Sequence, residues 1–329
     1  MGGFLKSEKL KQIEFKANSP DLSNEARTNG IYKGKPRPFC LPLKYAEQNL
    51  FSEIRQSAIA HFAKHSIKWH DGQNGKPSNH LCSSQVCCVN FLFPFADKPE
   101  VLAKVLELVF PNIKIMLPIE STQYVSFEWI GQENYLGEKV SRNGKRTRGA
   151  NCTSADAAVM FERMDGKRQI VLIEWKYTES YGGSSLKIAK SGTDRTEIYE
   201  PLFLRNDSTL NKFLLVSFDS LFFEPFYQFM RQQYLAYEME KAHEMGADIV
   251  SVLHIAPAHN HDFQKITSPE LKKLGESAVD VWKELVKSDK RFISVSIESL
   301  FGNLSEEQFP EIKTWVDYIH DRYRWLSDD

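Results

Sequence analysis

The sequence predicts an α/β fold in which helices cover both faces of a central β-sheet. Segments with strand patterns alternate with segments whose apolar residues recur at helical spacing, which favours this fold class. In addition, residues 153–181, TSADAAVMFERMDGKRQIVLIEWKYTESY, hold two apolar runs joined by Asp165-Gly166. Both runs are apolar on the two faces of a strand, as expected for a hairpin buried between layers.

The N-terminal part of the chain is expected to be mainly irregular and helical. Residues 1–45 are polar and basic, and we interpret them as an arm or an irregular layer. Apolar spacing predicts a helix over 46–65, and the run DGQNGKPSN predicts a loop over 71–79. Two further helices are expected, at 83–95 with a serine cap and at 97–111 with Pro99 in its first turn.

Strands and helices alternate through the rest of the chain. Strands are predicted at 121–131, 247–257 and 291–301, and helices at 224–246, 268–288 and 305–325. A polar connection, 178–208, is long enough to suggest a functional loop. The length of 329 residues fits one elaborated domain or two. We expect an N-terminal region (1–79), a core (80–255) and a C-terminal strand with helices packed on it (256–329).

The hairpin can be closed by two different loops, which place its charged residues differently. A two-residue loop pairs Met164 with Lys167 and puts Asp156 and Glu174 on opposite faces of the sheet. A three-residue loop pairs Arg163 with Lys167 and sets Asp156 directly across from Glu174. The three-residue loop also requires positive φ at its glycine.

The charged residues of the hairpin point to metal-dependent chemistry if the three-residue loop holds. Asp156 and Glu174 would repel each other at close range unless a cation joined them, and carboxylate oxygens suit Mg²⁺. Mn²⁺ is expected to substitute for it. Lys176 lies on the same face and could orient a water or offset charge in a transition state. This set of groups suits phosphodiester hydrolysis.

Composition narrows the class of protein. The net charge of −1 gives no overall basic signal, so any nucleic-acid site must be a local patch. Five scattered cysteines fit a reducing compartment better than a disulfide framework. The N-terminus shows no signal-peptide pattern, and no run approaches the ~18 apolar residues of a membrane span. We therefore expect a cytoplasmic protein.

The spacing of Asp156 from Glu174-Trp175-Lys176, at the end of an apolar strand, resembles the PD-(D/E)XK nuclease superfamily. The surrounding residues are similar to bacterial proteins of that superfamily classed as restriction endonucleases, over roughly 80–255. The resemblance implies an αβββαβ core with a mixed sheet and Mg²⁺-dependent DNA cleavage. It implies Asp156 and Glu174 as metal ligands, with the carbonyl of Trp175, and Lys176 as catalytic lysine. Ala155 stands where the superfamily's name has proline.

The superfamily often adds an acidic residue upstream. The helix at 83–95 offers Gln85, which is not an acid. Glu128, between two aromatic residues of a predicted strand, is therefore the preferred candidate, with Glu120 in reserve. Glu179, beyond the hairpin, is a further candidate for lining the site.

Two stretches are candidates for DNA contact. Gln233 and Tyr237 are spaced i, i+4 on a predicted helix and resemble the QxxxY motif of the RecB-like branch, which lies near the active site. The loop before Asp156 carries five basic residues and no acid after Glu138, which suits phosphate contacts: Lys139, Arg142, Lys145, Arg146 and Arg148. Residues 65–88 contain histidines and cysteines but no paired CxxC or HxxxH unit, so zinc is not expected there.

These observations give one leading function and two alternatives. The leading one is a Mg²⁺-dependent DNA endonuclease, in the restriction class. The alternatives are a RecB-like repair or recombination exonuclease and a catalytically inactive DNA-binding protein. The sequence leaves the oligomeric state open between a monomer and a homodimer, and it does not give the recognition sequence.

Overall fold

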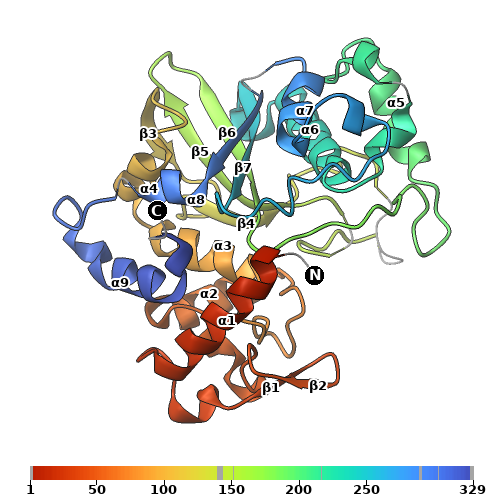
Figure 1. Cartoon of the computed structure of the whole chain (residues 1–329). Helices are drawn as coiled ribbons and strands as arrows, with labels where there is room; N and C mark the ends of the chain where they lie inside the picture. The colour runs from red at the N-terminus through yellow and green to blue at the C-terminus, as the bar shows by residue number, and fades with distance from the viewer. Residues whose placement is uncertain are drawn as a thin grey trace.

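The computed structural model describes residues 3–138, 144–150, 152–215, 217–288, 291–302 and 304–326. A mixed six-stranded sheet lies at its centre (Figure 1). Its strands are β3 (Ile113–Leu117), β4 (Val125–Trp129), β5 (Ala155–Arg163), β6 (Arg168–Trp175), β7 (Ile249–Ala256) and β8 (Phe292–Ser296). The predicted α/β class with a mixed sheet is confirmed.

The sheet changes from antiparallel to parallel at β6. Its order is β3-β5-β6-β7-β8, and β4 also pairs with β5. β5 pairs antiparallel with β3, β4 and β6, whereas β7 runs parallel to both β6 and β8. β3 and β4 pair with different parts of β5. β3 pairs with residues from Arg163 to Met160, and β4 pairs with residues from Val159 to Ala155. β4 therefore lies beside the first half of β5, where Asp156 stands.

The hairpin β5–β6 has the three-residue loop. Ala157 lies opposite Ile173, and the Arg163 N–H donates to the carbonyl of Lys167 at 2.8 Å. Gly166 has φ +80° and donates its N–H to the Arg163 carbonyl at 2.9 Å. An L side chain is strained at that φ, which explains the glycine. The register in which opposed residues share one face is confirmed.

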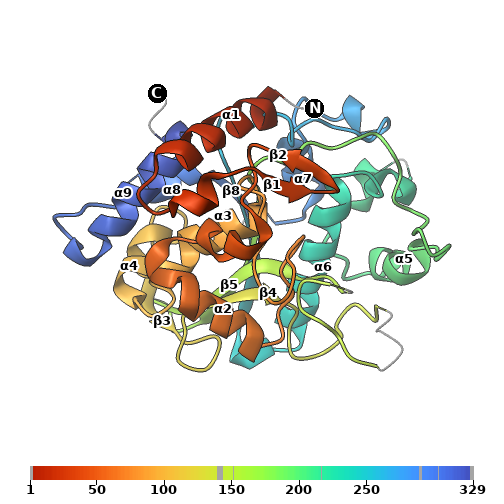
Figure 2. The same ribbon diagram turned by 90° about the horizontal axis from the view of Figure 1, so that it is seen from below.

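Helices cover both faces of the sheet, as predicted. One hydrophobic cluster joins β5 and β6 to α1 (Gly3–Asn18), α2 (Arg55–Lys64), α3 (Ser84–Leu92), α4 (Pro99–Leu106), α8 (Ile297–Phe301) and α9 (Lys313–Arg322). The other joins them to α5 (Thr196–Leu204), α6 (Phe226–Lys241) and α7 (Ala278–Leu285). Figure 2 shows these two groups on opposite sides of the molecule. Within the described ranges, no helix is both long and apolar enough to span a membrane.

The N-terminal region is more ordered than the sequence indicates. α1 and a two-stranded sheet, β1 (Gly30–Tyr32) and β2 (Lys35–Arg37), occupy the segment expected to be an arm. Phe15 is buried, and Gln12 donates to the Tyr177 hydroxyl at 3.2 Å and to the Arg322 carbonyl at 3.0 Å. Arg322 in turn donates to the Leu81 carbonyl at 3.1 Å. Polar contacts hold this region against the rest of the fold, so the spacing of apolar residues alone does not predict its order.

Several predicted boundaries are wrong for local reasons. The helix expected at 268–288 is interrupted, because Ser277 caps a shorter helix, α7, by accepting from the Asp280 N–H at 3.1 Å. The strand expected at 291–301 ends where Ser296 caps α8. The polar connection 178–208 contains α5, and the edge strand β3 was not predicted. Serine caps and edge strands carry weak patterns, which explains these differences.

Candidate active site

A cavity of about 550 Å³ lies where β5 begins and β6 ends. Its walls come from the segment 70–85, Glu128 on β4, the stretches 149–150 and 152–154, the two ends of the hairpin with the residues that follow it, and 228–232 on α6, and Leu5 and Tyr32 also contribute. Asp156, Glu174, Lys176 and Glu128 all line it. The fold therefore gathers the four predicted catalytic residues around one space.

The hairpin delivers three of these residues to one face of the sheet. The register that pairs Ala157 with Ile173, continued by one residue, sets Asp156 opposite Glu174. Asp156 Oδ2 accepts a hydrogen bond from the backbone N–H of Trp175 at 2.7 Å. Lys176 Nζ donates to Glu174 Oε1 at 2.5 Å.

Burial and mutual repulsion determine the charges in the cavity. Burial and the neighbouring Glu174 raise the pKa of Asp156 well above its ordinary value. Burial alone would lower the pKa of Lys176, but Glu174 and other anionic neighbours outweigh it and raise that pKa well above the ordinary value. Lys176 therefore carries a positive charge at neutral pH. A further cation nearby would stabilise the ionised form of Asp156.

Glu128 is held in an uncommon backbone conformation. Its φ is +49°, and the side chain is 2% exposed. Glu128 Oε1 accepts from Gln85 Nε2 at 2.7 Å and lies 3.1 Å from His70 Nε2. Glu128 Oε2 accepts from Ser154 Oγ at 2.7 Å. Positive φ at a non-glycine residue costs free energy, so the surrounding contacts must impose this orientation.

The contact between His70 and Glu128 changes the acidity of the imidazole. It raises the pKa of His70 above its ordinary value, against the opposing effect of burial. His70 also lines the cavity, and its side chain is half exposed. The pair thus brings a titratable group to the cavity beside a buried carboxylate.

Two arginines of the basic loop support the backbone around Glu128. Arg148 Nε donates to the Phe127 carbonyl at 3.0 Å and to the Glu128 carbonyl at 3.2 Å. Arg146 donates to four successive carbonyls at 2.6–3.0 Å, those of residues 130–133. In this structure these guanidinium donors bond within the protein, and the contact of Arg146 and Arg148 with phosphate stays a prediction. A loop next to an irregular strand needs such donors for its unpaired carbonyls.

The other basic residues of that loop are placed less fully. Lys139 and Arg142 lie outside the described residues. Lys145 is described and has an interaction partner. Their contact with DNA stays a prediction.

One face of α6 completes the cavity, but with other residues than expected. Gln232 Nε2 donates to Glu174 Oε2 at 2.9 Å and to the Ser154 carbonyl at 2.6 Å. Gln233 is buried and does not line the cavity, and Tyr237 lies against Arg205. Neither residue of the predicted QxxxY pair lines the cavity, whereas Gln232, one residue before Gln233, does. Each helical residue turns the side chain by about 100°, so neighbouring glutamines face different ways.

The cavity residues fit a hard divalent cation. Asp156, Glu174 and Glu128 supply carboxylate oxygens, which Mg²⁺ and Mn²⁺ prefer. Burial, followed by the charge of Glu174, raises the pKa of Asp156, so a nearby cation would favour its ionised form. The Trp175 carbonyl accepts from Ser84 Oγ at 3.3 Å. Glu179 lines the cavity and accepts from the Tyr177 N–H at 2.6 Å.

The structure adds residues that sequence reasoning did not assign to the site. They are His70, Gln85, Ser154, Gln228, Arg231 and Gln232. Gln85 offered a signal, because it is an amide in an otherwise apolar helix. Glu120, the reserve acid, does not line the cavity. Arg148 and two histidines surround it instead.

Comparison with known families finds one match that spans almost the whole chain. The family model described as restriction endonuclease associating with ARP matches residues 9–324. Neither a curated protein nor a solved structure matches the chain.

Proposed function

Because the chain belongs to the family of restriction endonucleases associating with ARP, we propose that it is a metal-dependent DNA endonuclease of the PD-(D/E)XK type. The family indicates a nuclease and DNA as its substrate. The observation that carries the finer proposal is the hairpin register, which brings Asp156, Glu174 and Lys176 to one cavity. That arrangement suits hydrolysis of a phosphodiester.

In the proposed reaction, the oxygen of a water forms a bond to phosphorus while one phosphorus–oxygen ester bond breaks. A proton lost from the water is balanced by a proton gained at the leaving oxygen. Asp156, Glu174 and the Trp175 carbonyl would hold Mg²⁺ or Mn²⁺, which would polarise the phosphoryl oxygen and acidify a bound water. The 2.7 Å bond from the Trp175 N–H orients Asp156 for this role.

The protein's own groups divide the remaining work. Lys176 is charged, so it supplies positive charge near the developing negative charge on phosphorus. Gln232 fixes the second oxygen of Glu174, which leaves the ammonium group of Lys176 on the first. Glu128, held by Gln85 and Ser154, extends the carboxylate set toward His70. Such fixed partners reduce the reorganisation needed during the reaction.

The order of elements supports the finer fold proposal. A helix (α3), three strands (β4, β5, β6), a helix (α6) and a strand (β7) occur in this order along the chain, interrupted by α4, β3 and α5. This order corresponds to the αβββαβ core that the resemblance implies. α4, β3 and α5 are then additions to that core.

The alternatives receive less support. The exonuclease interpretation rested on Gln233 and Tyr237, and neither lines the cavity. A catalytically inactive binding protein has no need to retain Asp156, Glu174 and Lys176 in one buried arrangement, since buried like charges are costly. An endonuclease is therefore preferred.

The test is cleavage of closed circular plasmid and of linear DNA, with Mg²⁺, Mn²⁺ or Ca²⁺. We expect wild-type protein to cut the closed circle with Mg²⁺ or Mn²⁺, and Asp156→Asn to leave it intact. Asp165→Asn, at the exposed turn of the same hairpin, is the matched control and should keep activity. Cleavage of linear DNA from its ends alone, or full activity of Asp156→Asn, would contradict the proposal.

A further inference from the structure

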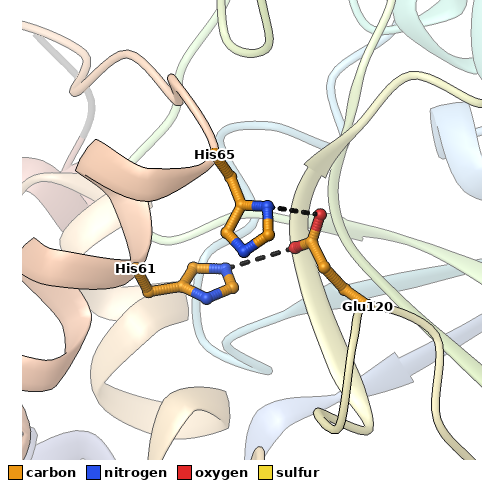
Figure 3. A group of neighbouring side chains, drawn as sticks. All are labelled: His61, His65 and Glu120. Atoms are coloured by element: carbon orange, nitrogen blue, oxygen red, sulfur yellow. Dashed lines mark ion pairs between the residues drawn. The ribbon is translucent and has the colours of Figure 1, made fainter.

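A second cluster of potential metal ligands lies outside the active-site cavity. His61 and His65, one turn apart on α2 and its C-terminal cap, both face Glu120 (Figure 3). His61 Nε2 lies 3.3 Å from Glu120 Oε2, and His65 Nδ1 lies 3.2 Å from Glu120 Oε1. The ligand atoms of the three residues lie within 4.8 Å of one another. His61 stands just before the stretch in which no HxxxH pair was found.

The imidazoles approach the carboxylate without completing the contacts expected of a buried polar group. His61 is 7% exposed, and its Nε2 lies 3.3 Å from Glu120 Oε2 without the alignment of a good hydrogen bond. A poorly aligned contact of a buried nitrogen costs free energy. Aromatic rings pack around His61 at centroid distances of 5.7 Å for Phe93 and 6.1 Å for Phe127. A buried imidazole nitrogen that faces a carboxylate beside a second imidazole is an arrangement that a metal ion would satisfy.

We propose that His61, His65 and Glu120 bind a transition-metal ion, with Zn²⁺ the best fit and water as the fourth ligand. Two imidazole nitrogens and one carboxylate oxygen are ligands that zinc takes in tetrahedral sites. Imidazole disfavours Mg²⁺, which prefers oxygen donors. None of the three residues lines the active-site cavity, so the two sites are separate.

Arg148 is compatible with this site because a carboxylate has several acceptor positions. The guanidinium group donates to Glu120 Oε1 at 2.5 Å and to Glu120 Oε2 at 3.2 Å. Oε2 also accepts from the Ser126 hydroxyl, whereas Oε1 keeps a second lone pair that the guanidinium leaves for a metal. Carboxylate ligands in metal sites are themselves usually hydrogen-bonded, and Arg148 fills that position.

The proposed ion would tie α2 to the strand that carries Glu128. Arg148, which contacts the proposed ligand Glu120, also donates to the carbonyl of Glu128. The Ser126 hydroxyl, on β4, donates to Glu120 at 3.1 Å. The site is therefore structural in its effect, and it stabilises the wall of the cavity without contacting a substrate.

The test uses the full chain, stripped of metal with a chelator and dialysed against Zn²⁺. We expect one zinc per chain to remain in the wild-type protein and in Asp156→Asn, and none in His65→Gln. Because the Asp156 variant removes the cavity ligand, the metal count separates this proposal from the proposed nuclease function. Retention of zinc by His65→Gln, or none in the wild type, would overturn it.

A second measurement covers the case in which the variant folds poorly. Co²⁺ replaces zinc in such sites, so titration of the stripped wild-type protein should give the intense visible absorption of a four-coordinate ion. Excess Zn²⁺ should abolish that absorption, whereas excess Mg²⁺ should not. Zn²⁺ should also raise the unfolding temperature of the wild type by a few degrees. Absence of the absorption, or its loss with Mg²⁺, would contradict the proposal.

Discussion

Two clusters of ionisable groups, one around the carboxylate of Glu120 and one in the cavity, differ in how carboxylate charge is offset. Glu120 contacts Arg148 and two histidines, and despite burial those contacts lower its pKa to about 2. Asp156 accepts a hydrogen bond from a backbone N–H, and its pKa is raised instead. The ammonium group of Lys176 lies in a cavity that is lined by the carboxylates of Asp156, Glu174 and Glu128.

This difference teaches how to separate structural from catalytic carboxylates. The Glu120 carboxylate is paired with a bidentate arginine, so its removal leaves that arginine unpaired and lowers stability. Carboxylates that crowd around one ammonium group leave a net need for a cation. Substitutions should therefore affect stability in the first cluster and activity in the second.

The largest expected effect is on catalysis, in the cavity. Lys176→Ala should lower cleavage by about 10³-fold or more while DNA binding survives, because the ammonium group acts on the transition state. Single-turnover cleavage and fluorescence anisotropy with labelled DNA measure the two properties. Arg231→Ala, on the same cavity wall, provides the comparison for lost binding. Equal loss of binding in both variants would show that Lys176 is not specific to the chemical step.

The next effect is on stability, in the Glu120 cluster. Glu120→Gln should lower the free energy of unfolding by about 3 kcal/mol, since it leaves the partly buried guanidinium of Arg148 without its partner. Urea unfolding measures this. The control is Glu162→Gln, whose partner Lys114 is exposed, and it should cost less than ~1 kcal/mol. Similar costs for both variants would remove the distinction between the clusters.

Among the residues that the structure describes, the buried imidazole of His254 has no carboxylate partner, and its contribution to stability depends on pH. His254, on β7, is fully buried, and burial lowers its pKa to about 3. The unfolded chain takes up a proton near pH 6.5 and the folded chain does not, so stability falls as pH drops below 6.5. The loss should be about 2 kcal/mol at pH 5.

His254→Leu should flatten this pH dependence, as measured by urea midpoints between pH 7.5 and 5. Phe263, whose ring lies 5.1 Å from that of His254 and carries no titratable group, is the control, and Phe263→Leu should leave the slope unchanged. An unchanged slope in the His254 variant would place the acid sensitivity elsewhere.

The smallest expected effect is at the hairpin turn. Gly166→Val should cost about 1–2 kcal/mol, because a β-branched residue resists positive φ. No atom lies within 4 Å of a Cβ added there, so the cost is conformational and not a clash. Gly166→Asn, which tolerates that conformation, should cost less. The valine variant should also lower cleavage slightly by disturbing the register, and equal stability of both variants would argue against this account.

The hairpin could be predicted from sequence because its determinants are local. The Asp-Gly turn locates the hairpin, and of its two possible loops only the three-residue loop sets Asp156 and Glu174 on the same face, which selects the register. Glu128 could be suspected from its apolar neighbours. Its partners Gln85 and Ser154 could not be assigned, because they come from distant segments that meet only in the folded chain.

The remaining site residues depend on geometry that patterns do not carry. Gln232 and Gln233 are chemically identical, and only the rotation of α6 selects the first. A basic loop suggests phosphate contacts, yet the donors of Arg146 are taken by four carbonyls of the chain's own backbone. Sequence composition therefore identifies the chemistry more readily than the partners.

The bond from Arg322 to the Leu81 carbonyl has a consequence for protein synthesis. Leu81 leads directly into the cavity wall at Cys82–Gln85, so this wall is anchored by an arginine 241 residues further along the chain. The ribosome releases the charged hairpin long before it releases α9. We expect the nascent chain to hold its carboxylates without a finished cavity. An incomplete copy would thus lack the arrangement on which the proposed DNA cleavage depends.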